Sequence, residues 1–223
     1  MLRAYLATVP KHGSTTDVVT DALREAVLDG VLPPSTWLRE GELADELSVS
    51  RTPVREALRR LSDEGLVVRN VHRGSLVAPM TVDDILAVYA VREMLEGMAT
   101  AQATRRRPAG LVDDLSRVHR EMTEHIDDDE PVALIKLELE FHRVLRDACG
   151  NPYLERFLTQ IEHAVRRFGR SNLLVPGRIR DMLAEHRAII EAVASGDADA
   201  ASSNAAEHMR SARDVRIRSM FST

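Results

Sequence analysis

Apolar residues recur at the 3.6-residue spacing of amphipathic helices in three stretches near the N-terminus. The stretches cover residues 14–30, 40–47 and 51–64. Gly30 and Gly65 mark helix ends, and only three residues separate the second helix from the third. Residues 1–13 lack the pattern and are predicted to form a flexible tail.

Two short β-prone runs, LVVRN and SLVAP, follow the third helix on either side of the tetrapeptide VHRG. This pattern predicts a small hairpin. Three helices, of which the second and third are joined by a tight turn, followed by a hairpin, form the layout of a winged helix-turn-helix. We therefore predict a winged helix-turn-helix DNA-binding domain over residues 14–79.

The rest of the chain is predicted to be entirely helical, from a start after Pro79 to the C-terminus. The six predicted helical segments cover residues 81–106, 109–127, 130–149, 151–170, 176–195 and 197–219. Their linkers are short, which favours antiparallel neighbours. The predicted fold class is therefore mainly α, with a winged helix-turn-helix followed by a six-helix antiparallel bundle over residues 80–223.

The third helix carries arginines on one face and apolar residues on the other. Arg51, Arg55 and Arg59 are spaced i, i+4, i+8 and share a face. The predicted core face holds Val54, Ala57, Leu58 and Leu61. An ordinary solvated helix with intrahelical ion pairs is the alternative interpretation of such a charge run.

The distribution of charge favours DNA over that alternative. The whole chain has a net charge of −5, yet residues 51–73 contain six arginines and three acidic residues. Positive charge is thus concentrated on the third helix and the hairpin, the two parts of a winged helix that face DNA. The predicted DNA-contacting residues are Arg51, Thr52, Arg55 and Arg59 on the helix, with Arg73 and Gly74 at the hairpin tip.

Composition adds few further constraints. Aromatic residues make up only 4% of the chain, which favours packed helices over extensive sheet. The single cysteine excludes an intramolecular disulfide. No apolar run approaches the roughly 18 residues of a membrane span, and no signal peptide is recognisable, so we expect a cytoplasmic protein without a membrane partner.

Four residues of the helical half are candidate metal ligands. Glu138 and His142 lie i, i+4 on one predicted helix, while His186 and His208 lie on two later helices. Imidazole and carboxylate suit divalent ions such as Zn²⁺ or Ni²⁺. From spacing alone, surface or core histidines without a metal are the commoner outcome.

Residues 38–78, which include VSRTPVREALRRL, EGL and RG, closely resemble the N-terminal domain of GntR-family bacterial transcription regulators. The resemblance implies DNA contacts from Arg51, Thr52, Arg55 and the Arg73-Gly74 tip. One departure is Gly41, which stands where many members have an arginine that positions the second helix on DNA. The operator preference of other members is therefore not transferred to this chain.

Residues 81–219 resemble the FCD ligand-binding domain of FadR-type GntR regulators through VYAVREMLE, EFHRVL, EHRAIIEAV and AAEHMR. Six helices instead of seven make the VanR-like subgroup the closer match. The resemblance implies a metal held by Glu138, His142, His186 and His208, with glutamate in place of the usual aspartate. His163 and Glu185 are weaker candidates, and Glu185 is predicted to be a solvent-facing neighbour of His186.

The same resemblance implies an effector pocket for a small organic acid, with Arg92 placed to bind its carboxylate. A surface ion pair between Arg92 and Glu96 is the alternative. The sequence thus predicts a homodimeric regulator, most simply a repressor, that binds a palindromic double-stranded operator and responds to this acid. A metal sensor and, less favoured, a metalloenzyme that uses the histidine site are the other hypotheses.

Overall fold

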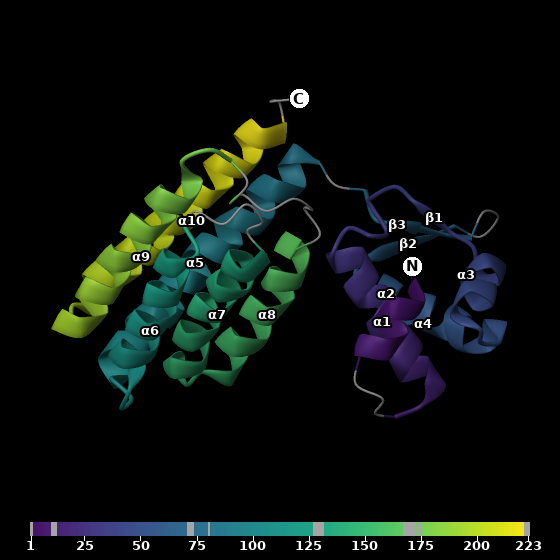
Figure 1. Ribbon diagram of the computed structural model, residues 1–223, viewed down its shortest axis with the longest axis horizontal. Coiled ribbons are helices and arrows are strands. Elements are labelled where there is room, and N and C mark those ends of the chain that lie inside the picture. Colours follow the sequence, from purple (N-terminus) through teal and green to yellow (C-terminus); the bar gives the residue numbers. More distant parts are fainter. Residues whose placement is uncertain are drawn as a thin grey trace. The chain divides into compact units, whose positions relative to one another are not determined.

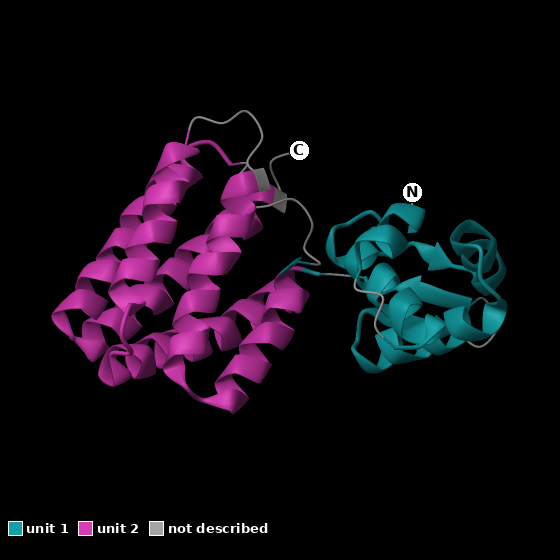
Figure 2. Cartoon of the chain, turned by 60° about the horizontal axis from the view of Figure 1, so that its bottom comes forward, with its two compact units in different colours: residues 1–81, 166–169 teal, residues 82–165, 170–223 magenta. Residues whose placement is uncertain are grey.

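The computed structural model describes residues 2–9, 13–70, 74–79, 81–126, 132–166, 173 and 175–220. The chain divides into two compact units, one formed by residues 1–81 with 166–169 and the other by residues 82–165 with 170–223 (Figure 2). The described residues are mainly helical, with one small sheet, so the predicted fold class is confirmed.

The described residues of the first unit form four helices and three short strands (Figure 1). In chain order they are α1 (Leu2–Thr8), α2 (Thr15–Leu28), β1 (Trp37–Leu38), α3 (Glu40–Leu47), α4 (Arg51–Asp63), β2 (Val67–Asn70) and β3 (Gly74–Val77). The predicted hairpin is β2–β3, an antiparallel pair in which Val67 is opposite Val77. Strand β1 was not predicted; it pairs with β3 and gives the order β1-β3-β2.

Local sequence explains where the helices of this unit begin and end. Ser14 and Asp17 form a reciprocal capping box at the start of α2. Gly65, with φ of 72°, follows the last turn of α4 in the left-handed conformation that glycine adopts without strain. The predicted apolar face of α4 is buried: Val54, Ala57 and Leu61 have no exposed area.

The prediction that residues 1–13 form a flexible tail is wrong for residues 2–8, which form helix α1. Leu2 in α1 is only 3% exposed and belongs to the core of the first unit, where Tyr5 and Leu6 also pack. A seven-residue helix is marginal by itself. Tertiary burial of its apolar face therefore stabilises α1, and local sequence patterning did not reveal it.

The described residues of the second unit form the six predicted helices (Figure 1). They are α5 (Val82–Arg106), α6 (Leu111–Glu124), α7 (Val132–Cys149), α8 (Pro152–Arg166), α9 (Arg178–Ser195) and α10 (Ala198–Met220). Helix α5 packs against α7, α9 and α10, and α6 packs against α7 and α9. Within the described ranges, none of the helices is long and apolar enough to cross a membrane.

Three consecutive arginines at the end of α5 tie this helix to three others. Arg105 pairs with Asp199 near the start of α10, with 3.2 Å between nitrogen and oxygen. Arg106 donates to the Ala148 carbonyl at the end of α7 (2.9 Å), and Arg107 donates to the Ala194 carbonyl at the end of α9 (3.0 Å). Cations at helix C-termini satisfy unpaired carbonyls and offset the helix dipole, so these contacts help fix the relative positions of the helices.

Gly150→Ala tests this arrangement. Gly150 has φ of 64°, and an added Cβ would lie 1.7 Å from an Arg106 guanidinium nitrogen, so Arg106 must leave the end of α7. Gly177→Ala is the matched control, because Gly177 also has positive φ but faces open space. We expect both variants to lose about 1 kcal/mol of unfolding free energy through backbone strain, and Gly150→Ala to lose about 1–2 kcal/mol more. Equal losses in denaturant unfolding would show that the Arg106 contact contributes nothing.

Candidate metal centre and nucleic-acid interface

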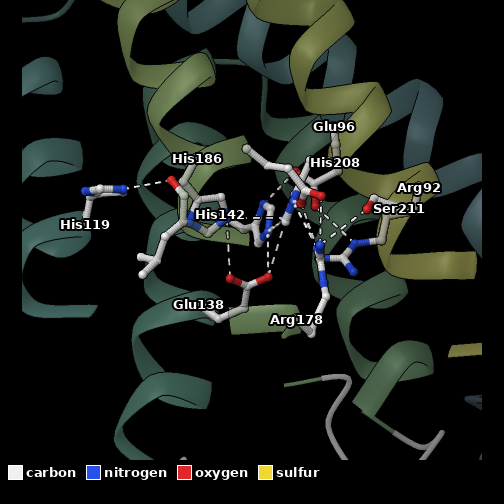
Figure 3. A network of polar contacts seen from close by, with 11 residues as sticks. Arg92, Glu96, His119, Glu138, His142, Arg178, His186, His208 and Ser211 are labelled. Carbon is white, nitrogen blue, oxygen red and sulfur yellow. Dashed lines mark hydrogen bonds and ion pairs between the residues drawn. The ribbon is translucent and has the colours of Figure 1, made fainter. Parts of the chain in front are cut away.

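Four side chains from three helices of the second unit converge on one point (Figure 3). Helix α7 supplies Glu138 and His142, one turn apart, while α9 supplies His186 and α10 supplies His208. Their ligand atoms all lie within 4.8 Å of one another. His186 and His208 are fully buried, so these imidazoles face each other inside the bundle instead of facing solvent.

The distances within this group fit a shared cation better than direct hydrogen bonds. The Nε2 atom of His208 lies 3.3 Å from the Nε2 atoms of both His142 and His186. Glu138 carboxylate oxygens lie 3.4–3.5 Å from the same three Nε2 atoms. Charge-assisted hydrogen bonds are shorter, about 2.7–2.9 Å. The corners of a tetrahedron around Zn²⁺, with ligands at about 2.0–2.1 Å, are separated by roughly 3.3–3.4 Å.

Unpaired buried atoms support the same conclusion. The Oε2 atom of Glu138 is buried and accepts no hydrogen bond from a described residue. An ionised carboxylate oxygen without a partner is costly to bury. A divalent cation at the centre of the four side chains would offset that cost. The donor set of three nitrogens and one oxygen is one that Zn²⁺ accepts, so the residues present fit a metal.

The outer nitrogen of His208 is hydrogen-bonded to a glutamate, and the outer nitrogen of His142 faces another glutamate without a hydrogen bond. Each of these glutamates is paired with a buried arginine. His208 Nδ1 lies 2.6 Å from Glu185, and Glu185 makes two contacts of 2.7 Å with Arg178. A hydrogen bond from Nδ1–H to the carboxylate leaves the Nε2 lone pair of His208 directed at the centre. The prediction that Glu185 is a solvent-facing neighbour of His186 is therefore wrong.

A second, looser connection of the same kind runs through α5. His142 Nδ1 lies 3.5 Å from Glu96, and Arg92 donates to Glu96 over 3.2 Å. The predicted alternative, an Arg92–Glu96 pair, thus forms, but the pair is buried next to the histidines and does not lie on the surface. His186 instead stacks on Phe141, with 3.9 Å between ring centroids and 8° between planes.

Electrostatics keep the carboxylates of the centre ionised. Burial raises the pKa of Glu96, but His142 and Arg92 outweigh this effect and lower that pKa to about 2. Burial also raises the pKa of Glu185, but His208 and Arg178 outweigh it and lower that pKa to about 2. Burial lowers the pKa of His142, but Glu96 and Glu138 outweigh it and raise that pKa to about 9. Burial holds the pKa of His186 well below its usual value. The centre therefore attracts positive charge.

In the first unit, the predicted DNA-contacting face of α4 is exposed. Arg51, Thr52, Arg55 and Arg59 are all exposed. Arg55 forms an ion pair with Glu40 of α3 (2.9 Å). Arg59 forms intrahelical pairs with Glu56 (2.6 Å) and Asp63 (3.0 Å), as the alternative interpretation of the charge run expects.

The start of α4 and the tip of the β2–β3 hairpin are the other parts of the predicted DNA-contacting surface. Ser50 occupies the N-cap position of α4, but its side chain makes no capping hydrogen bond. First-turn N–H groups of this kind suit a phosphate. The Arg51 guanidinium lies close to α3: a Cβ added to Gly41 of that helix would be 3.4 Å from it. At the hairpin, Gly74 has φ of 96°, and Arg73 lies outside the described residues.

Family models match both parts of the chain. The model described as bacterial regulatory proteins, gntR family, matches residues 15–77, and the FCD domain model matches residues 87–211, more than half of the chain. The chain belongs to the GntR family of bacterial regulatory proteins. It is a transcriptional regulator with an N-terminal GntR domain and a C-terminal FCD domain, and not an enzyme.

Curated relatives of this GntR-family regulator are also transcriptional regulators. The Bacillus subtilis HTH-type transcriptional regulator YdhC is 27% identical over 190 residues, which are 83% of this chain and 84% of the relative. The gluconate operon transcriptional repressor of the same species is 28% identical over 176 residues, 79% of this chain and 70% of the relative. Among solved structures, E. coli McbR/YncC has a TM-score of 0.76 at 21% identity and covers 94% of this chain and 100% of its own, a likeness of fold.

Sequence reasoning missed Arg178 and the roles of Glu96 and Glu185. Arg178 and Glu185 are seven residues apart on one helix, so their shared face was a usable signal. The link between Glu96 and His142 joins α5 to α7, and no sequence spacing indicates it.

Glu185→Gln tests the orienting role of this carboxylate in the GntR-family regulator. The amide removes the charged acceptor of His208 and leaves Arg178 buried without its counter-charge, so Zn²⁺ affinity should fall about 10–100-fold. Glu207→Gln, at an exposed glutamate paired with Arg210 on α10, is the control and should leave the affinity unchanged. Both are measured by competition with a chromophoric chelator. Unchanged affinity in Glu185→Gln would exclude the orienting role.

Proposed function

We propose that this regulator represses transcription as a homodimer on a palindromic operator, and that a small carboxylate bound at a divalent ion in the FCD domain controls its operator affinity. The observation that carries the proposal is the convergence of Glu138, His142, His186 and His208, with Arg92 beside them. Relatives named as repressors of gluconate and D-xylose operons support repression.

The exposed face of α4 is the proposed operator-contacting surface. Arg51, Thr52 and Arg55 lie at the N-terminal end of the helix, which enters the major groove in this motif. The pair between Arg55 and Glu40 is exposed, and exposed pairs contribute little stability. A phosphate or a guanine edge can therefore replace Glu40 at small cost. Arg59, Arg73 and Gly74 complete the proposed contact set.

The proposed metal ligands are Glu138, His142, His186 and His208. The donor set of three imidazoles and one carboxylate, with contacts of 3.3–3.5 Å between several of its atoms, favours Zn²⁺ over Ni²⁺, which also accepts imidazole but is typical of other geometries. When bound, Zn²⁺ supplies a positive anchor for a carboxylate at an additional coordination position. The two buried arginines then provide further positive charge at the same place.

Arg92 is the proposed second anchor for the effector. Its side chain is buried, and the hydrogen bond to Glu96 uses only Nε. The two terminal nitrogens form the pair of donors that binds a carboxylate side-on. The guanidinium is also close enough to Glu138 for that carboxylate to raise the Arg92 pKa, together with Glu96 and Tyr89, against the lowering effect of burial. A ligand that contacts both the ion and Arg92 would therefore be a small organic acid.

An exposed apolar surface supports the homodimer. Val91, Met94 and Met98 of α5 lie on one helix face, and Met94 is 70% exposed. Tyr153 and Phe157 of α8 are also exposed, at 69% and 48%. One small apolar cluster joins Ala99 of α5, Cys149 of α7, and Leu154 and Leu158 of α8. Large exposed apolar side chains on neighbouring helices are typical of protein interfaces, and a two-fold dimer matches a palindromic operator.

The test measures operator affinity at one fixed salt concentration, because phosphate contacts make it salt-dependent. An operator is first isolated by selection from genomic fragments and footprinted; two symmetric half-sites are expected. Small carboxylates are then added to metal-loaded and chelator-treated protein. We expect one acid to change the affinity at least tenfold, only when metal is present.

Arg92→Ala should abolish this response while effector-free operator affinity stays unchanged. Because Arg92 also pairs with Glu96 beside His142, the variant is tested at saturating metal and its metal content is measured in parallel. Glu93→Gln on the same helix is the control. A response to the ion alone, without any acid, would favour the metal sensor. No discrete footprint would contradict the proposed function as a whole.

A further inference from the structure

Helix α1 is anchored to the first unit at both of its ends. Near its start, Leu2 is buried in the core, and its backbone N–H donates to Glu46 of α3 over 3.0 Å. In its second turn, the Tyr5 hydroxyl donates to Asp29, the C-cap residue of α2, over 3.1 Å. The helix therefore connects the end of α2 with the end of α3.

Arg3 makes the most specific of these contacts. Its Nε donates to the Glu46 backbone carbonyl over 2.7 Å, and its Nη2 donates to the Ser48 hydroxyl. Carbonyls in the last turn of a helix have no partner within the helix. Arg3 thus caps the C-terminus of α3 from another helix, and its positive charge suits the negative end of the helix dipole.

The capped position is the turn of the helix-turn-helix. Helix α3 ends at Leu47 and α4 begins at Arg51, so residues 48–50 set the direction of α4. Ser48 has φ of 56°, a left-handed conformation that residues other than glycine rarely adopt. Ser50 adds no side-chain capping bond at the start of α4. A strained residue persists only where its surroundings hold it. The Ser48 N–H donates to the Ala44 and Asp45 carbonyls of α3, and Arg3 adds a contact to the Ser48 hydroxyl.

We propose that Arg3 is a positioning residue for operator binding, because it holds Ser48 and with it the angle at which α4 enters the groove. The proposal rests on the proposed function of α4 as the operator-contacting helix. It assigns a role to the N-terminal helix, whose residues are not among the proposed DNA contacts. In this role Arg3 acts through protein geometry and makes no contact with DNA.

A direct contact between Arg3 and a phosphate is the competing explanation, and salt dependence separates the two. A lost phosphate contact lowers the slope of log affinity against log salt by about 0.9 and weakens specific and non-specific DNA alike. A lost positioning contact leaves the slope unchanged and weakens mainly the specific complex, since only base contacts depend on the exact placement of α4.

The experiment measures binding of the full-length protein to its selected operator and to a scrambled duplex across a salt series. We expect Arg3→Ala to weaken operator binding about tenfold, to change scrambled-duplex binding less than twofold, and to keep the salt slope. Arg3→Lys, which keeps the charge but not the two-point contact, should behave similarly. Tyr5→Phe is the matched control, because it removes the contact of α1 with Asp29 and leaves the turn intact.

Ser48→Gly provides a second test, in case Arg3→Ala weakens operator binding only because it folds poorly. Glycine adopts positive φ without strain, so adding Arg3→Ala to Ser48→Gly should weaken operator binding less than threefold. Three results would each overturn the inference. The first is wild-type affinity in Arg3→Ala, and the second is a salt slope reduced by about one with equal loss on both duplexes. The third is an undiminished tenfold loss in the Ser48→Gly background. Absence of operator binding by the wild-type protein would instead contradict the proposed function.

Discussion

The burial of three imidazoles and a carboxylate around one point is the interaction on which the C-terminal unit depends. Removing the charge of Glu138 from water costs several kcal/mol unless a cation or a hydrogen bond compensates it. The four side chains come from α7, α9 and α10, so the compensating charge must join three helices that are separate in sequence. A small displacement of any one of them would separate the ligands.

Two features of the bundle act against such a displacement. At the end of α5, Arg106 and Arg107 bind the C-terminal carbonyls of α7 and α9, two of the helices that carry the ligands. Around the centre, Glu185 and Glu96 connect His208 and His142 to buried arginines. In the proposed function, an acid bound to the terminal nitrogens of Arg92 would lie next to Glu96 and His142, so its binding would depend on how these helices are arranged.

The DNA-binding unit is organised on a different principle. Its core is apolar, and Arg55 and Arg59 of α4 are paired at the surface with Glu40 and Glu56. Surface pairs of this kind are weak and exchange readily with phosphate, so they keep the arginines extended without consuming their binding energy. Between α3 and α4, Ser48 has a left-handed backbone conformation, and the proposed role of Arg3 is to hold this turn.

Much of this fold followed from helical periodicity and helix-ending residues, because long amphipathic segments with glycine or proline breaks leave few alternatives. Glu138 and His142 share a face by spacing alone, whereas their meeting with His186 and His208 was implied only by family resemblance. Helix α1 and strand β1 were missed because they are short and stabilised by tertiary contacts. Glu96 was not connected to His142 because the two residues lie on different helices, α5 and α7, and only tertiary packing brings them together.

X-ray absorption spectroscopy of the zinc-loaded protein, together with its metal content, shows whether the four side chains hold one ion. We expect one Zn²⁺ per chain with nitrogen and oxygen ligands at about 2.0–2.1 Å and an imidazole signal from three histidines. His186→Ala should lower that number to two and release most of the metal. An ion that is absent at stoichiometric zinc, or one whose spectrum and affinity are the same in His186→Ala, would contradict this expectation.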